Sequence, residues 1–364
     1  MRSHVRAAWL AGVVHFAFAI SGYAQHPNLQ VGFKPEQAYQ IGEVDSINLF
    51  NGNLTLQIPL GTPYPVNGGL SYSFSVAYNS KVWDYGFEMF VTCKSPYEDV
   101  RVPAASPAAR SNAGLGFRLS FGELNPPWTT RNAFSQWVYV SPDGSEHRFY
   151  QTLLPGEYDT DGSVWYTRDK TYLRLKLSNA VTCNNSSVYQ TAVVEFPDGS
   201  RHTFQPTSTC SSVYLLRKIE GPFLNASGAP LNWVAISYSP AGSVEPTQWT
   251  ISDSQGRTHT VTFEYQPNVT ELGPQVKTIT FQTYSGQPAV YQFSYEIVPD
   301  LYRSGKHQYS AYCQQCFRDQ DALPNTVAVP FLKSITLPDG SQWSSQVAIF
   351  VGFCSAPQSG AMSM

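Results

Sequence analysis

The chain has 364 residues and a formal net charge of −3, so it lacks the basic excess that marks a nucleic-acid-binding protein. Hydrophobic residues make up 42% of the sequence, which is enough for a substantial core, while charged residues make up only 13%. Aromatic residues reach 14%, and such a composition favours strands, where aromatic and β-branched side chains fit the pleat.

Residues 1–24 have the pattern of a secretory signal peptide. Arg2 and Arg6 precede the apolar run AAWLAGVVHFAFAI, and small residues at 22–24 precede Gln25. The run is short for a bilayer span, and an uncleaved anchor is the alternative. We therefore predict an exported chain that is secreted or held at the cell surface, with no membrane span after cleavage.

Apolar and polar residues alternate along most of the remaining chain. LSYSFSVAY at 70–78 is the clearest case, and YLRLKL at 172–177, HTVTFEY at 259–265 and YQFSYEI at 291–297 repeat the pattern. A period of two predicts half-buried strands, and no segment shows a sustained helical period. We predict an all-β chain of antiparallel hairpins, arranged as a β-sandwich or as an open, shell-like sheet.

Composition divides the chain into four parts. Residues 1–24 are the signal peptide, and residues 25–125 form a first β segment that includes an irregular, Pro-, Ala- and Ser-rich loop at 94–112. The sequence NPPW marks a boundary near residue 125, after which residues 126–345 form a hairpin-rich domain. Residues 346–364 supply a last strand and tail, and we expect self-association through the apolar edge at 331–352.

A Pro-Asp-Gly-Ser sequence occurs three times between predicted strands. Its central residues are Asp143 and Gly144, Asp198 and Gly199, and Asp339 and Gly340. Proline presets φ at the second position of a turn, aspartate caps the turn, and glycine accepts a positive φ. These residues are therefore predicted to form tight turns with a structural role.

Six cysteines fit an oxidising compartment and allow 15 disulfide connectivities. Cys183 and Cys210 flank a hairpin-like segment and are the favoured pair. Cys313 and Cys316 could close a small loop. A metal site would recruit His307 beside them but lacks an evident fourth ligand.

Motifs of catalysis are scarce in this sequence. A nucleophile elbow, a P-loop, a dinucleotide fingerprint and a zinc-protease motif are all absent. His147, His202 and His259 follow equivalent turns, and this recurrence favours one structural role over catalysis. We predict that the chain is not an enzyme and needs no cofactor.

One acidic stretch resembles part of a calcium loop. Glu157, Asp159 and Asp161 hold alternate positions before a glycine, but Arg168 stands where an EF-hand needs a glutamate. A hairpin turn with acidic flanks is the favoured alternative. Exposed Trp83, Trp128, Trp137 and Trp165 could instead stack on sugars, although core packing is the favoured explanation for aromatics in a β protein of low charge.

Three blocks carry a family resemblance. INLFNGNLTLQIPL at 47–60, GGLSYSFSVAYNS at 68–80 and GLGFRLSFG at 114–122 occur in this order, with Phe117 where the family has Trp. Together with the Pro-Asp-Gly-Ser turns, they resemble the N-terminal region of RHS/YD-repeat proteins, which include SpvB-like segments and the shell components of insecticidal toxin complexes. The resemblance covers about residues 40–345.

The resemblance implies a mechanical role. In that family, repeats wind a β-sheet into a hollow shell around a C-terminal toxin or effector, and this chain would be the shell's starting wall or plug. The expected partners are a downstream RHS-repeat core and effector, from the same or a longer chain. The Tyr-Asp repeats themselves are missing, so the chain is either a fragment or a stand-alone relative. The alternatives are an adhesin module that binds cell-surface glycan and, less favoured, a hydrolase on a β scaffold.

Overall fold

The computed structural model describes residues 39–41, 45–49, 52–91, 99–108, 110–127, 129, 132, 134–157, 162–184, 186–269, 271–283, 286–302 and 326–344. Within these ranges every regular element is a strand, and every strand pairing is antiparallel. The predicted all-β, antiparallel fold class is therefore confirmed. Over the same ranges, no helix is long and apolar enough to cross a membrane.

The N-terminal strands form a five-stranded sheet in the order β1-β2-β3-β4-β7. Its strands are β1 (Tyr39–Ile41), β2 (Asp45–Asn48), β3 (Leu54–Asn67), β4 (Leu70–Asn79) and β7 (Phe117–Leu119). The three sequence blocks that carry the family resemblance supply β2 with β3, then β4, and then β7. They are thus neighbours in one sheet, although more than thirty residues separate the last two.

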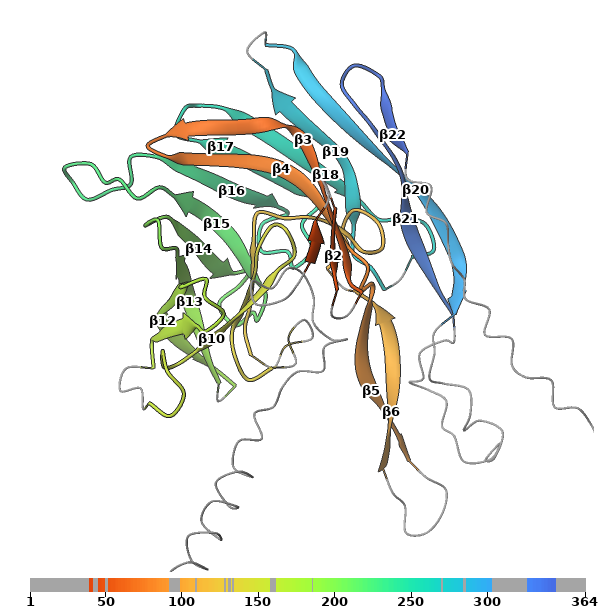
Figure 1. Ribbon diagram of the computed structural model, residues 1–364, viewed down its shortest axis with the longest axis horizontal. Helices are drawn as coiled ribbons and strands as arrows, with labels where there is room; N and C mark the ends of the chain where they lie inside the picture. Colours follow the sequence, from red (N-terminus) through yellow and green to blue (C-terminus); the bar gives the residue numbers. More distant parts are fainter. Residues whose placement is uncertain are drawn as a thin grey trace, which may run out of the picture.

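A two-stranded ribbon is inserted between β4 and β7. It consists of β5 (Trp83–Val91) and β6 (Asp99–Pro107) and projects from the body of the molecule (Figure 1). The irregular loop predicted for residues 94–112 is therefore wrong over Asp99–Pro107. Proline and alanine are poor strand formers, but the pairing with β5 supplies the backbone hydrogen bonds that local preference does not.

The remaining strands form one large sheet. They are β8 (Glu123–Asn125), β9 (Val138–Val140), β10 (Glu146–Tyr150), β11 (Val164–Thr167), β12 (Arg174–Cys183), β13 (Ser186–Glu195), β14 (Arg201–Pro206), β15 (Tyr214–Glu220), β16 (Trp233–Ser239), β17 (Gln248–Asp253), β18 (Thr258–Glu264), β19 (Gln275–Gln282), β20 (Pro288–Tyr302), β21 (Thr326–Thr336) and β22 (Gln342–Ser344). The change from the small sheet to the large one falls between β7 and β8, close to the boundary expected near residue 125.

The first part of the large sheet closes on itself. β14 pairs with β15, and β15 also pairs with β8 through Tyr214 and Leu124, so the strands from β8 to β15 form a closed ring. From β15 onward the sheet continues as an open meander to β22. Closure satisfies the backbone groups of β14, which would otherwise form an exposed edge.

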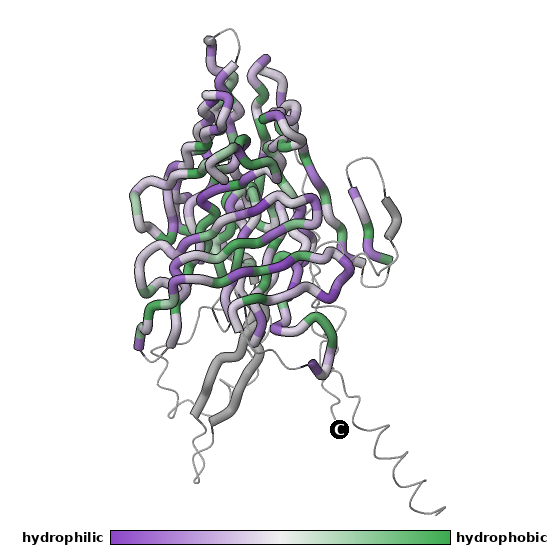
Figure 2. The backbone as a smooth tube through the Cα atoms, turned by 90° about the vertical axis from the view of Figure 1, so that its left-hand side faces the viewer, coloured by the Kyte–Doolittle hydropathy of each residue, from purple (hydrophilic) through white to green (hydrophobic). Residues whose placement is uncertain are grey.

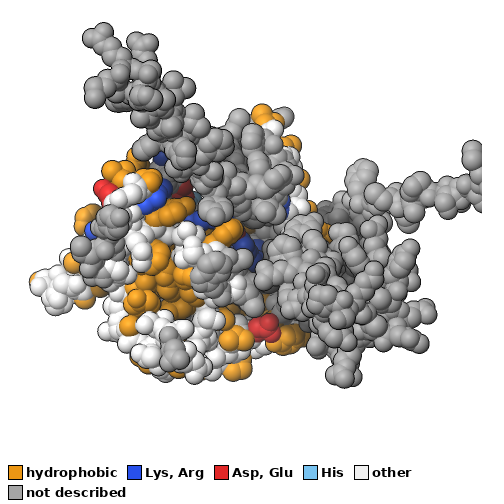
Figure 3. Space-filling view, turned by 90° about the horizontal axis from the view of Figure 1, so that it is seen from below, with side chains coloured by type: hydrophobic (Ala, Val, Ile, Leu, Met, Phe, Trp, Pro, Cys, Tyr) orange, Lys and Arg blue, Asp and Glu red, His pale blue; other side chains and the backbone are white. Residues whose placement is uncertain are grey.

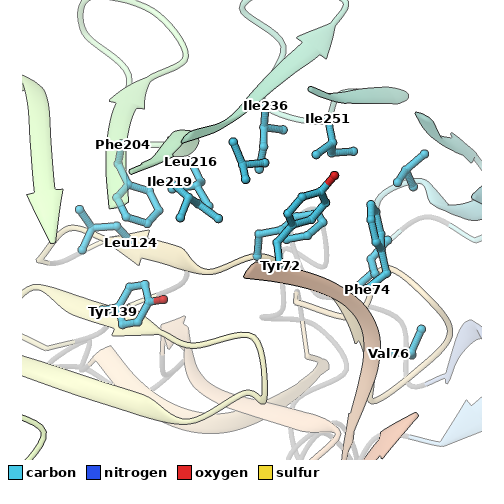
Figure 4. Packing of buried hydrophobic residues seen from close by; sticks show 14 of the residues in the cluster. Tyr72, Phe74, Val76, Leu124, Tyr139, Phe204, Leu216, Ile219, Ile236 and Ile251 are labelled. Carbon is cyan, nitrogen blue, oxygen red and sulfur yellow. The ribbon is translucent and has the colours of Figure 1, made fainter. Parts of the chain in front are cut away.

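The five-stranded sheet packs on the meander, and the two layers enclose a common core. Tyr72 of β4 points toward Ile236 and Ile251, and Phe74 and Val76 of the same strand belong to the same cluster (Figure 4). The alternation of apolar and polar positions along the strands is visible in Figure 2. The cluster continues into the ring, where Phe149, Leu175 and Phe204 are fully buried. Figure 3 shows apolar side chains gathered in the middle of the lower face, with Lys and Arg beside them.

The three Pro-Asp-Gly-Ser turns adopt one geometry. Gly144, Gly199 and Gly340 have φ of 87°, 84° and 85°. In the second turn the amide of Gly199 donates to the carbonyl of Phe196 (2.9 Å), and the amide of Ser200 donates to the Asp198 carboxylate (2.9 Å). A tight turn followed by a left-handed glycine is a common hairpin loop, as predicted. Asp143 and Asp339 accept the equivalent bonds from Ser145 and Ser341.

The favoured cysteine pair is also present. A disulfide joins Cys183, at the end of β12, to Cys210, with a Cα–Cα distance of 5.7 Å and a sequence separation of 27. Closing a loop of this length contributes about 3–4 kcal/mol of stability in the chain-entropy model. The pairing proposed for Cys313 and Cys316 lies outside the described residues, as do the signal peptide and residues 346–364.

We expect Gly199→Val to lower the free energy of unfolding by about 1–3 kcal/mol, because a β-branched residue resists a positive φ. An added Cβ would also lie 2.9 Å from Cβ of Pro222. Gly340→Val is the matched control, since its φ is equivalent but no atom lies within 4 Å of its added Cβ. Urea denaturation of both variants checks the prediction. A loss below about 1 kcal/mol for Gly199→Val would contradict it, and equal losses in the two variants would show that the contact with Pro222 adds nothing.

Candidate functional site

A buried chain of hydrogen bonds joins the two layers. The hydroxyl of Tyr72, on β4, donates to Oδ2 of Asp253 (2.9 Å) and lies 2.9 Å from Nε2 of His259. All three residues are buried, although Tyr72 is more than 180 residues from the other two. We call Tyr72, Asp253, Arg257 and His259 the interlayer network.

The geometry around His259 defines its protonation. Its Nδ1 accepts the backbone N–H of Gln282 (3.2 Å), so the ring proton lies on Nε2 and is donated to the Tyr72 hydroxyl. Burial lowers the pKa of His259 to about 4, with Asp253 opposing the shift and Arg257 adding to it. His259 is therefore neutral at physiological pH and links Gln282 and Tyr72 through its two ring nitrogens.

The turn after β17 clamps the β3–β4 hairpin. Arg257 pairs through Nε with Asp253 (2.6 Å) and donates through Nη2 to the carbonyl of Pro65 (2.7 Å). Nε2 of Gln255 donates to the carbonyl of Val66 (3.3 Å). Burial alone would raise the pKa of Asp253, but the hydrogen bonds from Arg257 and Tyr72 outweigh it and lower that pKa. The network therefore holds a buried carboxylate in its charged form.

We expect Tyr72→Phe to lower the free energy of unfolding by about 1–3 kcal/mol, because Asp253 and His259 would lose a buried partner without gaining water. Tyr78→Phe on the same strand is the control. It removes a hydroxyl that makes no hydrogen bond to the described residues. Thermal and urea unfolding of the two variants give the comparison, and equal losses would show that the network contributes nothing specific.

The other two predicted histidines also lie in structural settings, each with a different partner. Nδ1 of His147 lies 2.7 Å from Oδ2 of Asp169. Burial opposes ionisation of Asp169, but the hydrogen bonds from His147 and Thr171 outweigh it and lower its pKa to about 2. Nδ1 of His202 lies 3.2 Å from the Tyr139 hydroxyl, and burial lowers the pKa of His202 to about 4.

Stability is expected to fall in mild acid. His202 and His259 have folded-state pKa values of about 4, below the free imidazole value of 6.5. Between these values the unfolded chain binds more protons, so lowering the pH decreases the free energy of unfolding, by on the order of 1–3 kcal/mol for each histidine. Urea midpoints at about pH 7 and about pH 5 measure the effect, and His259→Gln should reduce its slope. Equal midpoints in the unmodified protein would contradict the assignment.

The acidic stretch considered for calcium is described only in part. Oε2 of Glu157 accepts the backbone N–H of Leu154 (2.8 Å), while Asp159 and Asp161 lie outside the described residues. Gly162 has a φ of 65°, as a hairpin turn requires. Within the described ranges, no group of three His, Cys, Asp or Glu side chains is placed to hold a metal ion.

Of the four tryptophans considered for sugar stacking, one is buried and two are half-buried against core clusters. Trp137 is 5% exposed and meets Tyr214 edge to face at 5.3 Å. Trp165 packs on the main core and donates to the carbonyl of Gly162 (3.1 Å), and Trp83 packs on a second cluster. Trp128 lies outside the described residues. The packing interpretation therefore applies to these three side chains.

A cavity of about 120 Å³ lies beside strands β15 to β18 of the large sheet. Strands β16 to β18 contribute Tyr238, Trp249 and Phe263, and the start of β15 contributes residues 214–216. The loops around residues 110–112, 120–123, 244–246 and 273–274 complete the wall. Sequence reasoning did not single out Trp249. Alternation places an aromatic residue on one face of a strand, but it does not tell whether another layer covers that position.

No family model and no curated protein matches the chain. Among solved structures, the N-terminal domain of the effector protein SpvB from Salmonella typhimurium strain LT2 is similar, with 10% sequence identity and a TM-score of 0.38. The match covers 80% of this chain and 99% of that chain.

Proposed function

We propose that the chain is an exported, non-enzymatic β module that forms the starting wall or plug of a β-shell around an effector segment. The sequence blocks that resemble RHS/YD-repeat proteins are the first support. They assemble into the adjacent strands β2, β3, β4 and β7, and Phe117 packs against Tyr78 with ring centroids 4.6 Å apart. The three sequence blocks that resemble the family thus form one packing unit in this chain.

The observation that carries the proposal is the asymmetry of the large sheet. One end of the sheet closes into the ring of β8 to β15. The other end is the edge strand β22, which within the described residues pairs only with β21. All three residues of β22 are exposed. A sheet that begins closed and ends in an edge strand is suited to starting a longer wall, because further strands can add at only one end.

The edge also continues the apolar face of the sheet. Trp343 lies opposite buried Ile335 in the β21–β22 pairing but is itself 46% exposed. Cross-strand partners share a face, so Trp343 lies on the core-facing side of the sheet, next to Ile335 but outside the region where that side is buried. An added strand or a following segment would bury this side chain and use the free backbone groups.

The histidines support a non-enzymatic role. Each of His147, His202 and His259 has a structural partner, and burial keeps the latter two neutral. A general base must instead reach a substrate proton. A shell component requires stable packing of this kind and no reacting group.

The test is to recover the tagged full chain from its own host and to identify its partners by mass spectrometry. We expect near-stoichiometric recovery of a polypeptide with Tyr-Asp repeats, and protection of its effector segment from added protease. Recovery of the chain alone, or with an effector that stays protease-sensitive, would refute the shell role.

Trp343→Lys should weaken this recovery at least tenfold, because a charge on the edge strand opposes strand addition. Val181→Lys provides the control, since it places the same charge at an exposed apolar strand position in the ring. Equal recovery with both variants would show that β22 is not the joining edge.

A further inference from the structure

The loop between β15 and β16 forms an exposed apolar projection of the large sheet. It spans residues 221–232, with the sequence GPFLNASGAPLN, and contains no charged residue. Figure 1 shows it projecting beyond the strands that it joins, at the left-hand edge of the molecule. Phe223, Leu224 and Leu231 are 56%, 49% and 52% exposed, and no other loop within the described residues exposes three large apolar side chains. Exposed apolar clusters of this kind mark contact surfaces.

Most polar groups of this loop are satisfied within it. Oδ1 of Asn225 accepts the backbone N–H and the hydroxyl of Ser227 (3.0 and 2.7 Å) and the backbone N–H of Ala229 (2.9 Å). The N–H of Asn225 donates to the carbonyl of Ala229 (2.8 Å). The N–H of Leu231 donates to the carbonyl of Phe223 (2.9 Å). Because backbone groups that enter lipid must keep their hydrogen bonds, these bonds equip the loop to leave water.

The same features favour a lipid surface over a protein partner. Strand addition requires free backbone groups, and this loop uses its own groups internally. Contact patches between proteins surround their apolar anchors with a polar rim, which includes charged residues, and the loop has none. The interfacial region of a bilayer requires only apolar side chains and a satisfied backbone.

The surface behind the loop is electrically balanced. Glu220 pairs with Lys218 (2.9 Å) and with Arg201 (3.6 Å). The β13–β14 turn, which carries Asp198, lies against Pro222. These groups bring two cations and two carboxylates, so attraction to anionic lipid is not expected to drive binding.

We infer that the β15–β16 loop inserts into the interfacial region of a lipid bilayer and docks the chain on a zwitterionic membrane surface. The tip at Ser227 lies about three residues beyond Leu224, which is roughly 10 Å along a strand. Interfacial segments enter the bilayer by about 5–10 Å, so the loop is long enough to bring its apolar side chains to the acyl chains. The inference does not depend on the proposed shell role, because it uses neither the ring closure nor the β22 edge.

The experiment mixes the chain, in the form that its host exports, with phosphatidylcholine vesicles and measures the bound fraction by sedimentation. Binding should change by less than about twofold between low and high salt. Leu224→Asp should weaken it at least about tenfold, because the carboxylate would have to leave water. Leu153→Asp is the matched control, since it places the same charge on a leucine of the β10–β11 loop that is 54% exposed, and it should leave binding unchanged.

A second measurement locates the contact. The fluorescence of Phe223→Trp should be quenched by phosphatidylcholine that is brominated in its acyl chains, and that of Leu153→Trp should not. The unmodified chain supplies the background of the native tryptophans, and circular dichroism verifies that each variant is folded.

Three results would overturn the inference: no binding to vesicles, equal losses in Leu224→Asp and Leu153→Asp, or no added quenching in Phe223→Trp. Light scattering provides a fourth. If the unmodified chain were a dimer that Leu224→Asp converts to a monomer, the loop would bind a second copy of the chain and not a membrane.

Discussion

The interlayer network is the constraint on which the arrangement of the two sheets depends. Its members come from β4 and from the β17–β18 hairpin, and Asp253 is held as a buried carboxylate by Arg257 and Tyr72. Breaking a buried ion pair leaves an uncompensated charge, which is far more costly than losing an apolar contact. Because a shift of one residue turns every side chain of a strand to the opposite face, the network also defines the register of β4 against the meander.

The same clamp explains why a hairpin rich in Gly and Pro can be a central element. β3 contains three prolines and one glycine, and its pairing with β4 is interrupted by register shifts. The carbonyls of Pro65 and Val66, near these shifts, accept hydrogen bonds from Arg257 and Gln255. The second layer therefore supplies the partners that a regular ladder would have provided.

Low charge and high aromatic content have two structural consequences. Aromatic side chains fill the interlayer space in edge-to-face contacts, such as Phe74 with Phe281 at 4.7 Å. The same kind of side chain also lines the cavity beside β15 to β18, as Trp249 shows.

The sequence by itself determined the local features. Alternation predicted the strands, the Pro-Asp-Gly-Ser turns predicted the positive φ of Gly144, Gly199 and Gly340, and the cysteine spacing favoured the Cys183–Cys210 disulfide. Each of these depends on neighbours along the chain or on one short loop. The tertiary structure alone decided the ring closure between β14 and β15, the strand at Asp99–Pro107, the partners of the three histidines and the position of Trp249 at a cavity. These features depend on which strands meet across more than 180 residues. A period of two tells which side chains share a face but not what that face will contact.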